Sequence, residues 1–140
     1  MATRLSHLGI AVPAHEDVLH FWRDLLGLEL ELTEHVASEG VSVAMLRLGA
    51  GSGCVELLQP DPGEDNPVGK YLAKRGPGMH HVALEVDDIA GVMAAMKEAG
   101  VRLLDDEPRP GAHDTRVAFV HPKSTGGVLV ELVQAGSGGH

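Results

Sequence analysis

The sequence predicts an α+β protein in which one βαβββ module occurs twice. Three pairs of apolar segments recur at nearly the same offset along the chain. The matched segments begin at His7 and His81 (81 − 7 = 74), at Val43 and Val117 (117 − 43 = 74), and at Val55 and Val130 (130 − 55 = 75). A period of this length is too long for a solenoid, so it favours two copies of one folded module. Alternating polarity and one stretch of helical spacing in each copy predict the order strand, helix, strand, strand, strand.

The first module begins with a strand over Leu5–Val12, whose side chains alternate with period two. On that strand His7 would share a face with the small residues Gly9 and Ala11. Apolar residues at helical spacing, followed by a glycine, predict the helix. Runs rich in valine and leucine between glycine-containing turns predict the other strands. These further elements are expected at 16–26 (helix), 28–32, 41–48 and 54–59 (strands), with 49–53 as a hairpin-like connection.

The second module repeats this pattern after a polar connection at 60–77, which carries a short helix at 68–75. Asp87 or Asp88 would cap the helix of this module. Its expected elements are strand 81–86, helix 89–99, strand 101–104, a polar loop at 105–114, and strands 116–120 and 128–134. We therefore expect one domain over 1–134, made of modules 5–59 and 78–134, with a flexible tail at 135–140.

Charge and composition argue against several classes of partner. The chain has 140 residues, a formal net charge of −9 at pH 7 and 44% hydrophobic residues. The negative charge argues against nucleic acids and anionic membranes as partners. No apolar run approaches the roughly 20 residues of a membrane span. Cys54 is the single cysteine, so no internal disulfide forms. Without a visible signal peptide, we expect a cytoplasmic protein.

The repeat selects four polar residues that stand in otherwise apolar strands. His7 corresponds to His81, and Glu56 corresponds to Glu131. Two imidazoles and two carboxylates without a thiolate suit one divalent ion such as Co, Mn, Ni, Fe(II), Zn or Mg. Four protein ligands in an octahedral shell would leave two positions for a bidentate oxygen substrate. We therefore expect the two modules to form a curved mixed sheet around this metal site.

Each of these residues also has an ordinary structural interpretation. A single histidine at a strand start is usually hydrogen-bonded, and a single strand glutamate usually faces water, so only the matched recurrence favours metal ligands. Alternation places His80 on the face opposite His81 and outside the set. Cys54 is interpreted as a small buried hydrophobe, and Gln59 and Gln134 as strand-end surface residues. The other histidines are assigned to surface, loop or tail positions: His15, His20, His35, His113 and His140.

The segment from His121 to Gly127 is the other distinctive stretch. It contains a lysine, two hydroxyl side chains and two glycines. Such a loop is able to offer one positive charge and several backbone N–H groups to an anion. On composition alone, an ordinary hairpin turn is the better interpretation.

At these residues the sequence resembles a known superfamily. Two modules with His and Glu on matching strands resemble the vicinal oxygen chelate superfamily, which includes glyoxalase I, extradiol dioxygenases, fosfomycin-resistance enzymes and bleomycin-binding proteins. Within it, the sequence is similar to the methylmalonyl-CoA epimerase family over residues 5–134. Three segments carry this similarity, and the last is the most specific. They are Gly78–Ile89, Gly100–Leu104 with Glu107-Pro108, and His121–Leu132.

The resemblance implies a metal-dependent enzyme with ligands at the four positions that the repeat selects. The implied reaction interconverts (2R)- and (2S)-methylmalonyl-CoA by removal and return of the α-proton through a metal-stabilised enolate. Glu131, Glu56 and a metal-bound water are the candidate proton-transfer groups. Some epimerases carry a further acidic residue on the third strand, but Val41-Ser42-Val43-Ala44 has none. The second proton-transfer group is therefore open.

The resemblance also implies an acyl-CoA substrate, and we expect a homodimer. A net-acidic protein that binds a multiply charged anion needs local positive charge. Lys123, Ser124, Gly126 and Arg116 are the expected substrate-binding residues. Further cations on the connecting segment are candidates for the nucleotide: Lys70, Lys74 and Arg75.

Two alternative functions follow from the same superfamily. A glyoxalase I-like isomerase uses the same ligand types, so only substrate tests separate it. A ring-cleaving dioxygenase normally needs three ligands and open positions for oxygen, and Glu56 as a fourth ligand argues against it. A non-catalytic drug-binding protein of the bleomycin-resistance type need not bind metal, and the full ligand set argues against it. Fold alone does not decide among these functions.

Overall fold

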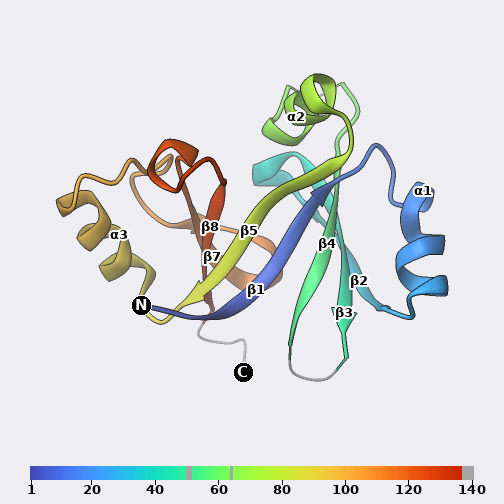
Figure 1. Ribbon diagram of the computed structural model, residues 1–140, viewed down its shortest axis with the longest axis horizontal. Helices are drawn as coiled ribbons and strands as arrows, with labels where there is room; N and C mark the ends of the chain where they lie inside the picture. The colour runs from blue at the N-terminus through green and yellow to red at the C-terminus, as the bar shows by residue number, and fades with distance from the viewer. Residues whose placement is uncertain (50–51, 64, 137–140) are drawn as a thin grey trace. The chain divides into compact units, whose positions relative to one another are not determined.

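The computed structural model describes residues 1–49, 52–63 and 65–136 (Figure 1). The predicted connection at 49–53 and the predicted tail at 135–140 therefore lie partly outside the described residues. The chain divides into two compact units. We call residues 7–80 the N-terminal unit, and residues 1–6 together with 81–140 the C-terminal unit. Each unit is described separately below.

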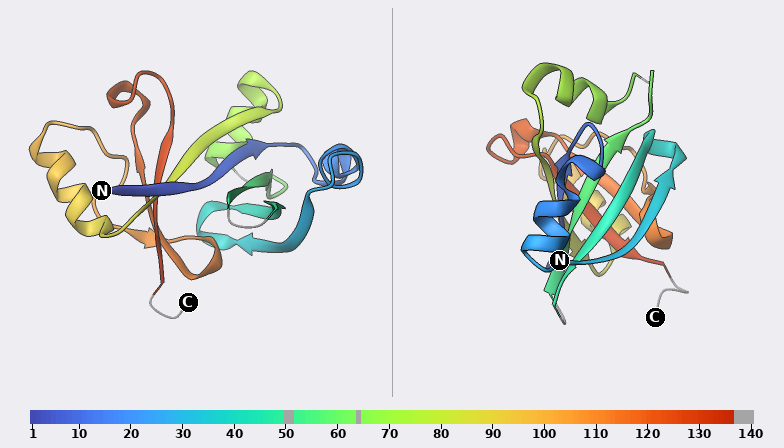
Figure 2. Two further views of the ribbon diagram at one scale, coloured as in Figure 1. Left: turned by 60° about the horizontal axis from the view of Figure 1, so that its bottom comes forward. Right: turned by 90° about the vertical axis from the view of Figure 1, so that its right-hand side faces the viewer.

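The described residues of the N-terminal unit form a four-stranded mixed sheet with four short helical elements. Its strand order is β2-β3-β4-β1, with β1 parallel to β4 and the other pairs antiparallel. The right-hand view of Figure 2 shows β2, β3 and β4 side by side. The strands are β1 (Ala2–Ala11, from residue 7 in this unit), β2 (Glu29–Val36), β3 (Val41–Leu48) and β4 (Ser52–Pro60). The helices are α1 (Glu16–Leu19), the π-helical turn η1 (His20–Leu25), the 3₁₀ turn η2 (Ala37–Glu39) and α2 (Pro67–Arg75).

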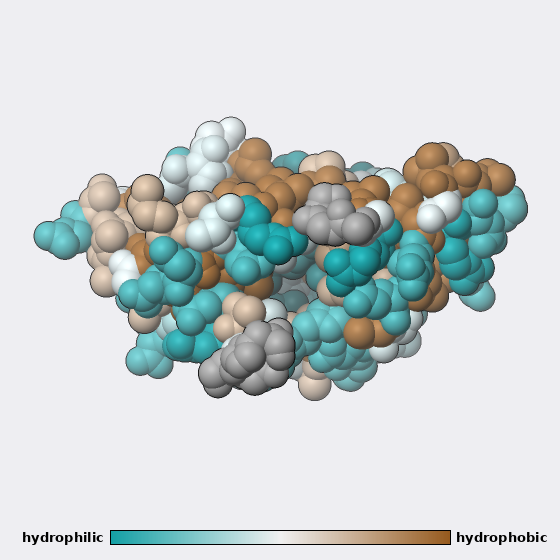
Figure 3. All heavy atoms as spheres, turned by 90° about the horizontal axis from the view of Figure 1, so that it is seen from below, coloured by the Kyte–Doolittle hydropathy of each residue, from teal (hydrophilic) through white to brown (hydrophobic). Residues whose placement is uncertain are grey.

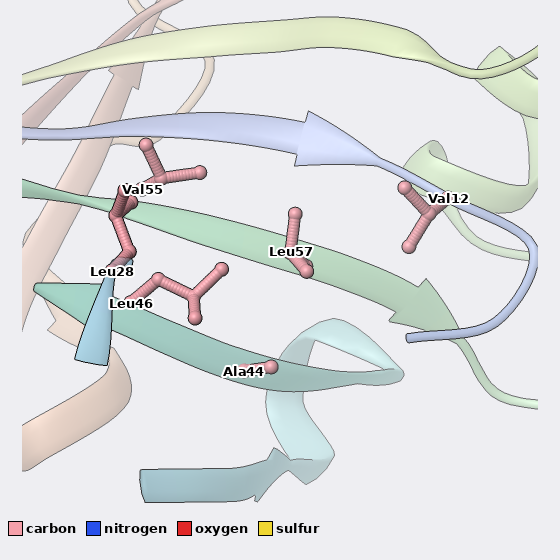
Figure 4. Packing of buried hydrophobic residues seen from close by; sticks show 6 residues of the cluster. All are labelled: Val12, Leu28, Ala44, Leu46, Val55 and Leu57. Carbon is pink, nitrogen blue, oxygen red and sulfur yellow. The ribbon is translucent and has the colours of Figure 1, made fainter. Parts of the chain in front are cut away.

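One face of this sheet forms an apolar core under the first helix. Leu46 and Leu57 are fully buried, and Val12, Leu28, Ala44 and Val55 complete the cluster (Figure 4). Trp22 and two aliphatic residues of α1 pack against it. Burial of each large aliphatic side chain contributes roughly 1.5–3 kcal/mol. The core therefore holds α1 and η1 against one face of the sheet and leaves the other face for different residues.

The C-terminal unit repeats this construction with the strand order β5-β8-β7-β6. β5 is parallel to β8, and the remaining pairs are antiparallel. The elements are β5 (Gly78–Val86, from residue 81 in this unit), α3 (Ile89–Glu98), β6 (Arg109–Pro110), β7 (Thr115–Val120), β8 (Val130–Ala135) and the 3₁₀ turns η3 (Ala112–Asp114) and η4 (Pro122–Ser124). The predicted α+β class with two βαβββ modules is confirmed.

Helix α3 covers one face of the second sheet. Ile89 and Met93 of the helix pack with Ala118, Val120 and Leu132 of β7 and β8. The carboxylate of Asp88 accepts a hydrogen bond from the N–H of Gly91 at 3.2 Å and so caps the helix. The prediction of an aspartate cap is confirmed. Figure 1 shows α3 on the side of β7 and β8.

The prediction of a strand at 101–104 is wrong. These residues form only an isolated bridge from Leu103 to Val120. The N–H of Leu104 donates to the carbonyl of Phe119 within this bridge, but the N–H of Arg102 donates to the Ser124 hydroxyl oxygen in the loop beyond β7. The strand that extends the sheet at this edge is β6, which lies inside the predicted loop.

The first helix also differs from its prediction. Only Glu16–Leu19 is α-helical, and the rest of the expected segment is the π-helical turn η1. The N–H of Leu26 donates to the carbonyl of Phe21, five residues earlier, at 3.0 Å. This wider turn carries Phe21, Leu25 and Leu26, which are 50%, 67% and 54% exposed. Brown apolar patches stand among teal hydrophilic residues on the face that Figure 3 draws.

Gln59 and Gln134 are not the surface residues that we expected. The Gln59 side-chain oxygen accepts the backbone N–H of His15 at 2.9 Å, and that of Gln134 accepts the N–H of Ile89 at 2.7 Å. Ile89 and His15 are again 89 − 15 = 74 residues apart. The first N–H groups of a helix have no partner within the helix. In each unit, a glutamine at the end of the last strand supplies that partner and ties the helix start to the sheet.

Among the described residues, no helix has both the length and the apolar character needed to cross a membrane.

Replacement of Gln134 by leucine should destabilise the protein. It removes the acceptor of the Ile89 N–H in a half-buried position, so we expect a loss of about 1–3 kcal/mol. Urea unfolding followed by circular dichroism measures this loss. Gln134→Glu keeps an oxygen acceptor and should retain most of the stability. An unfolding midpoint for Gln134→Leu equal to that of the wild type would contradict the role of the glutamine.

Candidate metal and substrate site

The N-terminal unit buries one imidazole–carboxylate pair. His7 lies on β1 and Glu56 on the parallel neighbour β4, where Gly9 is the residue opposite Glu56. The His7 Nε2 and the Glu56 Oε1 are 3.3 Å apart, and both residues are only 6% exposed. Because Gly9 has no side chain, the two polar groups are able to meet across the strands.

The C-terminal unit buries an equivalent pair. His81 lies on β5 and Glu131 on the parallel neighbour β8, where Ala83 is opposite Glu131. The His81 Nε2 and the Glu131 Oε1 are 2.9 Å apart, and both residues are nearly fully buried. Ala83 corresponds to Gly9 in the sequence repeat, with 83 − 9 = 74. A second small residue thus makes room for a second polar pair.

The chemistry of both pairs suits a divalent metal ion. Buried polar groups cost free energy unless they are paired, and each pair satisfies one imidazole with one carboxylate. The ring nitrogen and carboxylate oxygen of the two pairs are 3.3 and 2.9 Å apart, a separation that two neighbouring ligands of one ion also have. Imidazole nitrogen and carboxylate oxygen are donors that Zn, Co, Ni and Mn accept. Each unit therefore offers one nitrogen and one oxygen donor in a dry environment.

His80 is separate from these pairs, as the strand alternation predicts. Its ring meets the ring of Tyr71 edge to face, with centroids 5.2 Å apart. His35 forms an ion pair with Asp61 at 2.9 Å. His15 lies closer to the sheet than expected for helix surface, because its Nε2 contacts the carbonyl oxygens of Ser42 and Leu57 at 2.9 and 3.0 Å. These three histidines have structural partners.

Cys54 is buried, as predicted for a small hydrophobe. Burial, and after it the negative charge of Glu56, raises the pKa of its thiol from 9.0 to about 12. Arg47 acts in the opposite direction and does not compensate. The thiolate is the nucleophilic form of cysteine, so this side chain has no activated nucleophile to offer. Acyl transfer through Cys54 is therefore disfavoured.

The loop after β7 gathers positive charge in the C-terminal unit. The backbone N–H of His121 donates to the Arg102 carbonyl at 2.9 Å, and the Lys123 N–H donates to the His121 Nδ1 at 3.0 Å. Desolvation, together with the nearby charges of Arg102 and Lys123, holds the pKa of His121 below its usual value. Gly126 has a φ of 85°, which a residue with a side chain rarely adopts. We call Arg102 and Lys123, whose charges both act on His121, the basic cluster.

Arg116 lies on the other side of its sheet from Glu131. Phe119 is opposite Glu131 across β7 and β8, and Arg116 is an odd number of residues from Phe119, so it points to the face covered by α3. There it lines a surface groove of about 440 Å³ together with Lys97 and Glu107. The structure therefore does not bring Arg116 and Glu131 together within this unit.

The cations expected on the connecting segment lie on α2 in the N-terminal unit. Lys70 is 3.6 Å from the carboxylate of Asp65, and the Arg75 guanidinium lies over the Tyr71 ring at 6.0 Å. Lys74 is exposed near the end of the helix.

Sequence reasoning missed an arrangement beside His81. The Arg109 Nε donates to one oxygen of Asp105 at 2.9 Å, and the backbone N–H of Phe119 donates to the other at 2.8 Å. The Arg109 guanidinium lies over the Phe119 ring at 5.3 Å, and that ring meets the His81 ring edge to face at 5.6 Å. In the sequence, an acid and a base four residues apart, Asp105 and Arg109, suggest an ion pair within the predicted loop. This spacing does not reveal that both residues also contact Phe119.

This fold and its paired polar strands belong to a known class of proteins. Residues 6–119 match the Glyoxalase/Bleomycin resistance protein/Dioxygenase superfamily, and the chain belongs to that superfamily. Two relatives and one solved structure place it more narrowly. The mitochondrial methylmalonyl-CoA epimerase of Mus musculus is 44% identical over 133 residues, which cover 94% of this chain and 73% of that protein. The ethylmalonyl-CoA/methylmalonyl-CoA epimerase of Cereibacter sphaeroides is 40% identical and covers 96% and 99%.

The structural comparison agrees with these relatives. A variant of Streptomyces coelicolor methylmalonyl-CoA epimerase in complex with 2-nitronate-propionyl-CoA has a TM-score of 0.91 and 40% identity. The match covers 98% of this chain and 97% of that one. The chain therefore belongs to the methylmalonyl-CoA epimerase family.

Proposed function

We propose that this protein interconverts the (2R) and (2S) forms of methylmalonyl-CoA. It is an enzyme of the racemase and epimerase class, as its family membership establishes. The observation that carries the reaction is the buried imidazole–carboxylate pair in each unit, in a chain 44% identical to a named epimerase. The residues favour proton transfer because the single thiol is buried and not activated.

We propose that one divalent metal ion is held by His7, Glu56, His81 and Glu131. Their repetition at matched strand positions, their burial and the donor chemistry of each pair support this ligand set. When bound, the ion supplies Lewis-acid stabilisation of the negative charge that develops on the substrate oxygens. The donors suit Co, Mn, Ni, Zn and Mg, and metal analysis decides among them.

The proton-transfer groups are the two buried glutamates. Among the residues that the structure describes, Glu56 and Glu131 are the only buried carboxylates. β3 (Val41–Leu48) carries no acidic residue, so it supplies no additional base. One carboxylate removes the α-proton from one face of the substrate, and an acid returns a proton to the other face. A nearby cation favours the charged form of a carboxylate and weakens it as a base, so the glutamate that moves the proton would be released from the ion or only loosely held by it.

The basic cluster is the proposed binding place for the phosphates of the CoA. The protein carries a net charge of −9, so a multiply charged anion needs a local concentration of positive charge. Lys123 and Ser124 are exposed in the loop between β7 and β8, and Gly126 lies in the same loop. Glu131 is the second residue of β8, the strand that follows this loop. Arg116 lies on the α3 side of the sheet, on the face opposite Glu131, so we expect Lys123 and not Arg116 to contact the CoA phosphates.

The rival functions are not favoured. The relatives and the structural match are named epimerases at about 40% identity over most of the chain. A non-catalytic binding protein would have no need for two buried imidazole–carboxylate pairs. A homodimer is proposed as the working form, and light scattering of the purified protein tests it.

Replacement of His81 by alanine should remove most of the bound metal. Protein purified without chelator should carry about one equivalent of divalent metal per chain, as a single site requires. Metal analysis by mass spectrometry measures it. His80→Ala is the matched control and should keep the metal, since His80 contacts Tyr71 instead. Equal metal content in His81→Ala and the wild type would disprove the ligand assignment.

Incubation of either methylmalonyl-CoA epimer in D₂O should invert the stereocentre and exchange the α-hydrogen for deuterium. Chelation should stop both processes, and added metal should restore both. Glu131→Gln should lower the turnover about 100-fold or more with a smaller effect on KM, because a general base contributes that much. NMR of the product measures exchange and inversion together. No exchange by metal-loaded wild type at saturating substrate rules out the epimerase reaction.

Lys123→Ala should raise the KM for methylmalonyl-CoA roughly tenfold, the effect of one lost charge-assisted hydrogen bond. It should leave the KM unchanged for methylmalonyl-pantetheine, which lacks the nucleotide phosphates. Lys97→Ala removes an equally exposed cation of the same unit and is the control. The effect of Lys123→Ala should shrink as salt is added. If Lys123→Ala changes the KM equally for both substrates, Lys123 does not bind the nucleotide phosphates.

A further inference from the structure

The two imidazole–carboxylate pairs differ in what stands beside them. In the C-terminal unit the buried ring of Phe119 meets the His81 ring with centroids 5.6 Å apart and planes at 88°. Aromatic rings prefer this edge-to-face arrangement, and it restricts how either ring turns. The orientation of the His81 imidazole therefore depends on the position of Phe119.

Phe119 is itself held by Asp105. Its backbone N–H donates to one carboxylate oxygen of Asp105 at 2.8 Å, and the other oxygen accepts the Nε of Arg109 at 2.9 Å. The side chain of Asp105 is 16% exposed, so water competes little for these bonds. A single carboxylate thus fixes both the backbone at Phe119 and the guanidinium of Arg109.

The guanidinium of Arg109 lies over the ring of Phe119, on the sheet face that carries the His81–Glu131 pair. Its guanidinium carbon lies 5.3 Å from the ring centroid, within the range of a cation–π interaction. Arg109 is opposite Val117 on β7, and Phe119 is opposite Glu131 on β8. Directly opposed residues, and residues two apart on one strand, point to the same face of a sheet. Arg109, Phe119 and Glu131 therefore share the face that holds His81.

The N-terminal unit has no such arrangement at its matched positions. The counterpart of Phe119 is Met45 (119 − 74 = 45), which is opposite Glu56. The residue opposite Val43, where Arg109 would stand, is Glu34. Methionine is flexible and adapts to its surroundings, so it does not fix a neighbouring ring as phenylalanine does. The His7–Glu56 pair is also wider, at 3.3 Å against 2.9 Å.

We propose that Arg109 is a positioning residue that fixes the His81 imidazole through the ring of Phe119, and so makes the C-terminal pair the more firmly held half of the metal site. The proposal rests on the proposed metal-binding function. Residues that orient a ligand without touching the ion typically affect metal affinity 10–100-fold. At the matched positions of the N-terminal pair, Met45 and Glu34 take the places of Phe119 and Arg109.

Titration of the metal-free full-length protein with Co²⁺ alone tests the proposal. Arg109→Gln should weaken Co²⁺ binding about tenfold and alter the visible absorption spectrum of the bound cobalt. Arg109→Lys keeps the charge over the ring and should recover part of the affinity. Glu34→Gln, the matched position in the N-terminal unit, should bind Co²⁺ like the wild type. Unchanged affinity in Arg109→Gln, even with a lowered melting temperature, overturns the proposal, because it leaves only a structural role.

A double-mutant cycle decides whether Phe119 transmits the effect. Phe119→Leu should weaken Co²⁺ binding at least as much as Arg109→Gln. The double variant should then be no weaker than Phe119→Leu alone, because Arg109 has lost the ring through which it acts. Additive losses would overturn the proposed route through Phe119.

A metal-free measurement separates failure of this proposal from failure of the metal site. At one fixed pH, the ring-proton NMR shifts of His81 report the position of the Phe119 ring. Arg109→Gln should move them toward their values in Phe119→Leu, and Glu34→Gln should not move them. If wild-type protein takes up no Co²⁺, the metal site fails while this comparison still tests Arg109. His81 shifts that stay at wild-type values in Arg109→Gln overturn the proposal.

Discussion

The structure depends on the burial of two imidazole–carboxylate pairs inside apolar strands. Breaking a buried ion pair by removal of one partner costs about 3–5 kcal/mol, so each group needs its partner in place. In both units the histidine and the glutamate stand on neighbouring parallel strands. The residue opposite the glutamate is Gly9 in one unit and Ala83 in the other. The strand register places a small residue opposite each glutamate, which leaves room for the histidine of the pair.

Much of this arrangement could be predicted because it repeats. Offsets of 74 and 75 aligned the strands and selected His7, Glu56, His81 and Glu131, and strand alternation set His80 apart. The structure shows two buried pairs from this set. What the repeat could not predict are contacts formed by only one module or by side chains distant in sequence. The strand expected at 101–104 is reduced to one bridge with Val120, because the backbone N–H of Arg102 donates to the Ser124 side chain instead of to a strand carbonyl.

Side-chain partners at long range account for the other differences. Gln59 and Gln134 lie on the opposite strand face from the glutamates, which suggested that their side chains are exposed to solvent. Each side-chain oxygen instead accepts a hydrogen bond from a backbone N–H at the start of a helix. His15 similarly reaches two strand carbonyls from the start of its helix. A polarity pattern predicts the strand face on which a side chain lies. It does not predict which nearby backbone N–H needs that side chain as a hydrogen-bond acceptor. Arg109 escaped notice for the same reason, since its meaning depends on Phe119.

Strand β1 has a consequence for the order in which the protein folds. Its first residues belong to the C-terminal unit, where the amino group of Met1 contacts Asp87 at 2.8 Å and Thr3 donates to the Glu85 carbonyl. These partners are 86 and 82 residues apart in the chain. Contacts between distant residues close slowly, because the intervening loop must lose entropy first. Residues 1–6 must therefore wait for partners 82 to 86 residues further along the chain, while residues 7–80 are able to begin assembly without them.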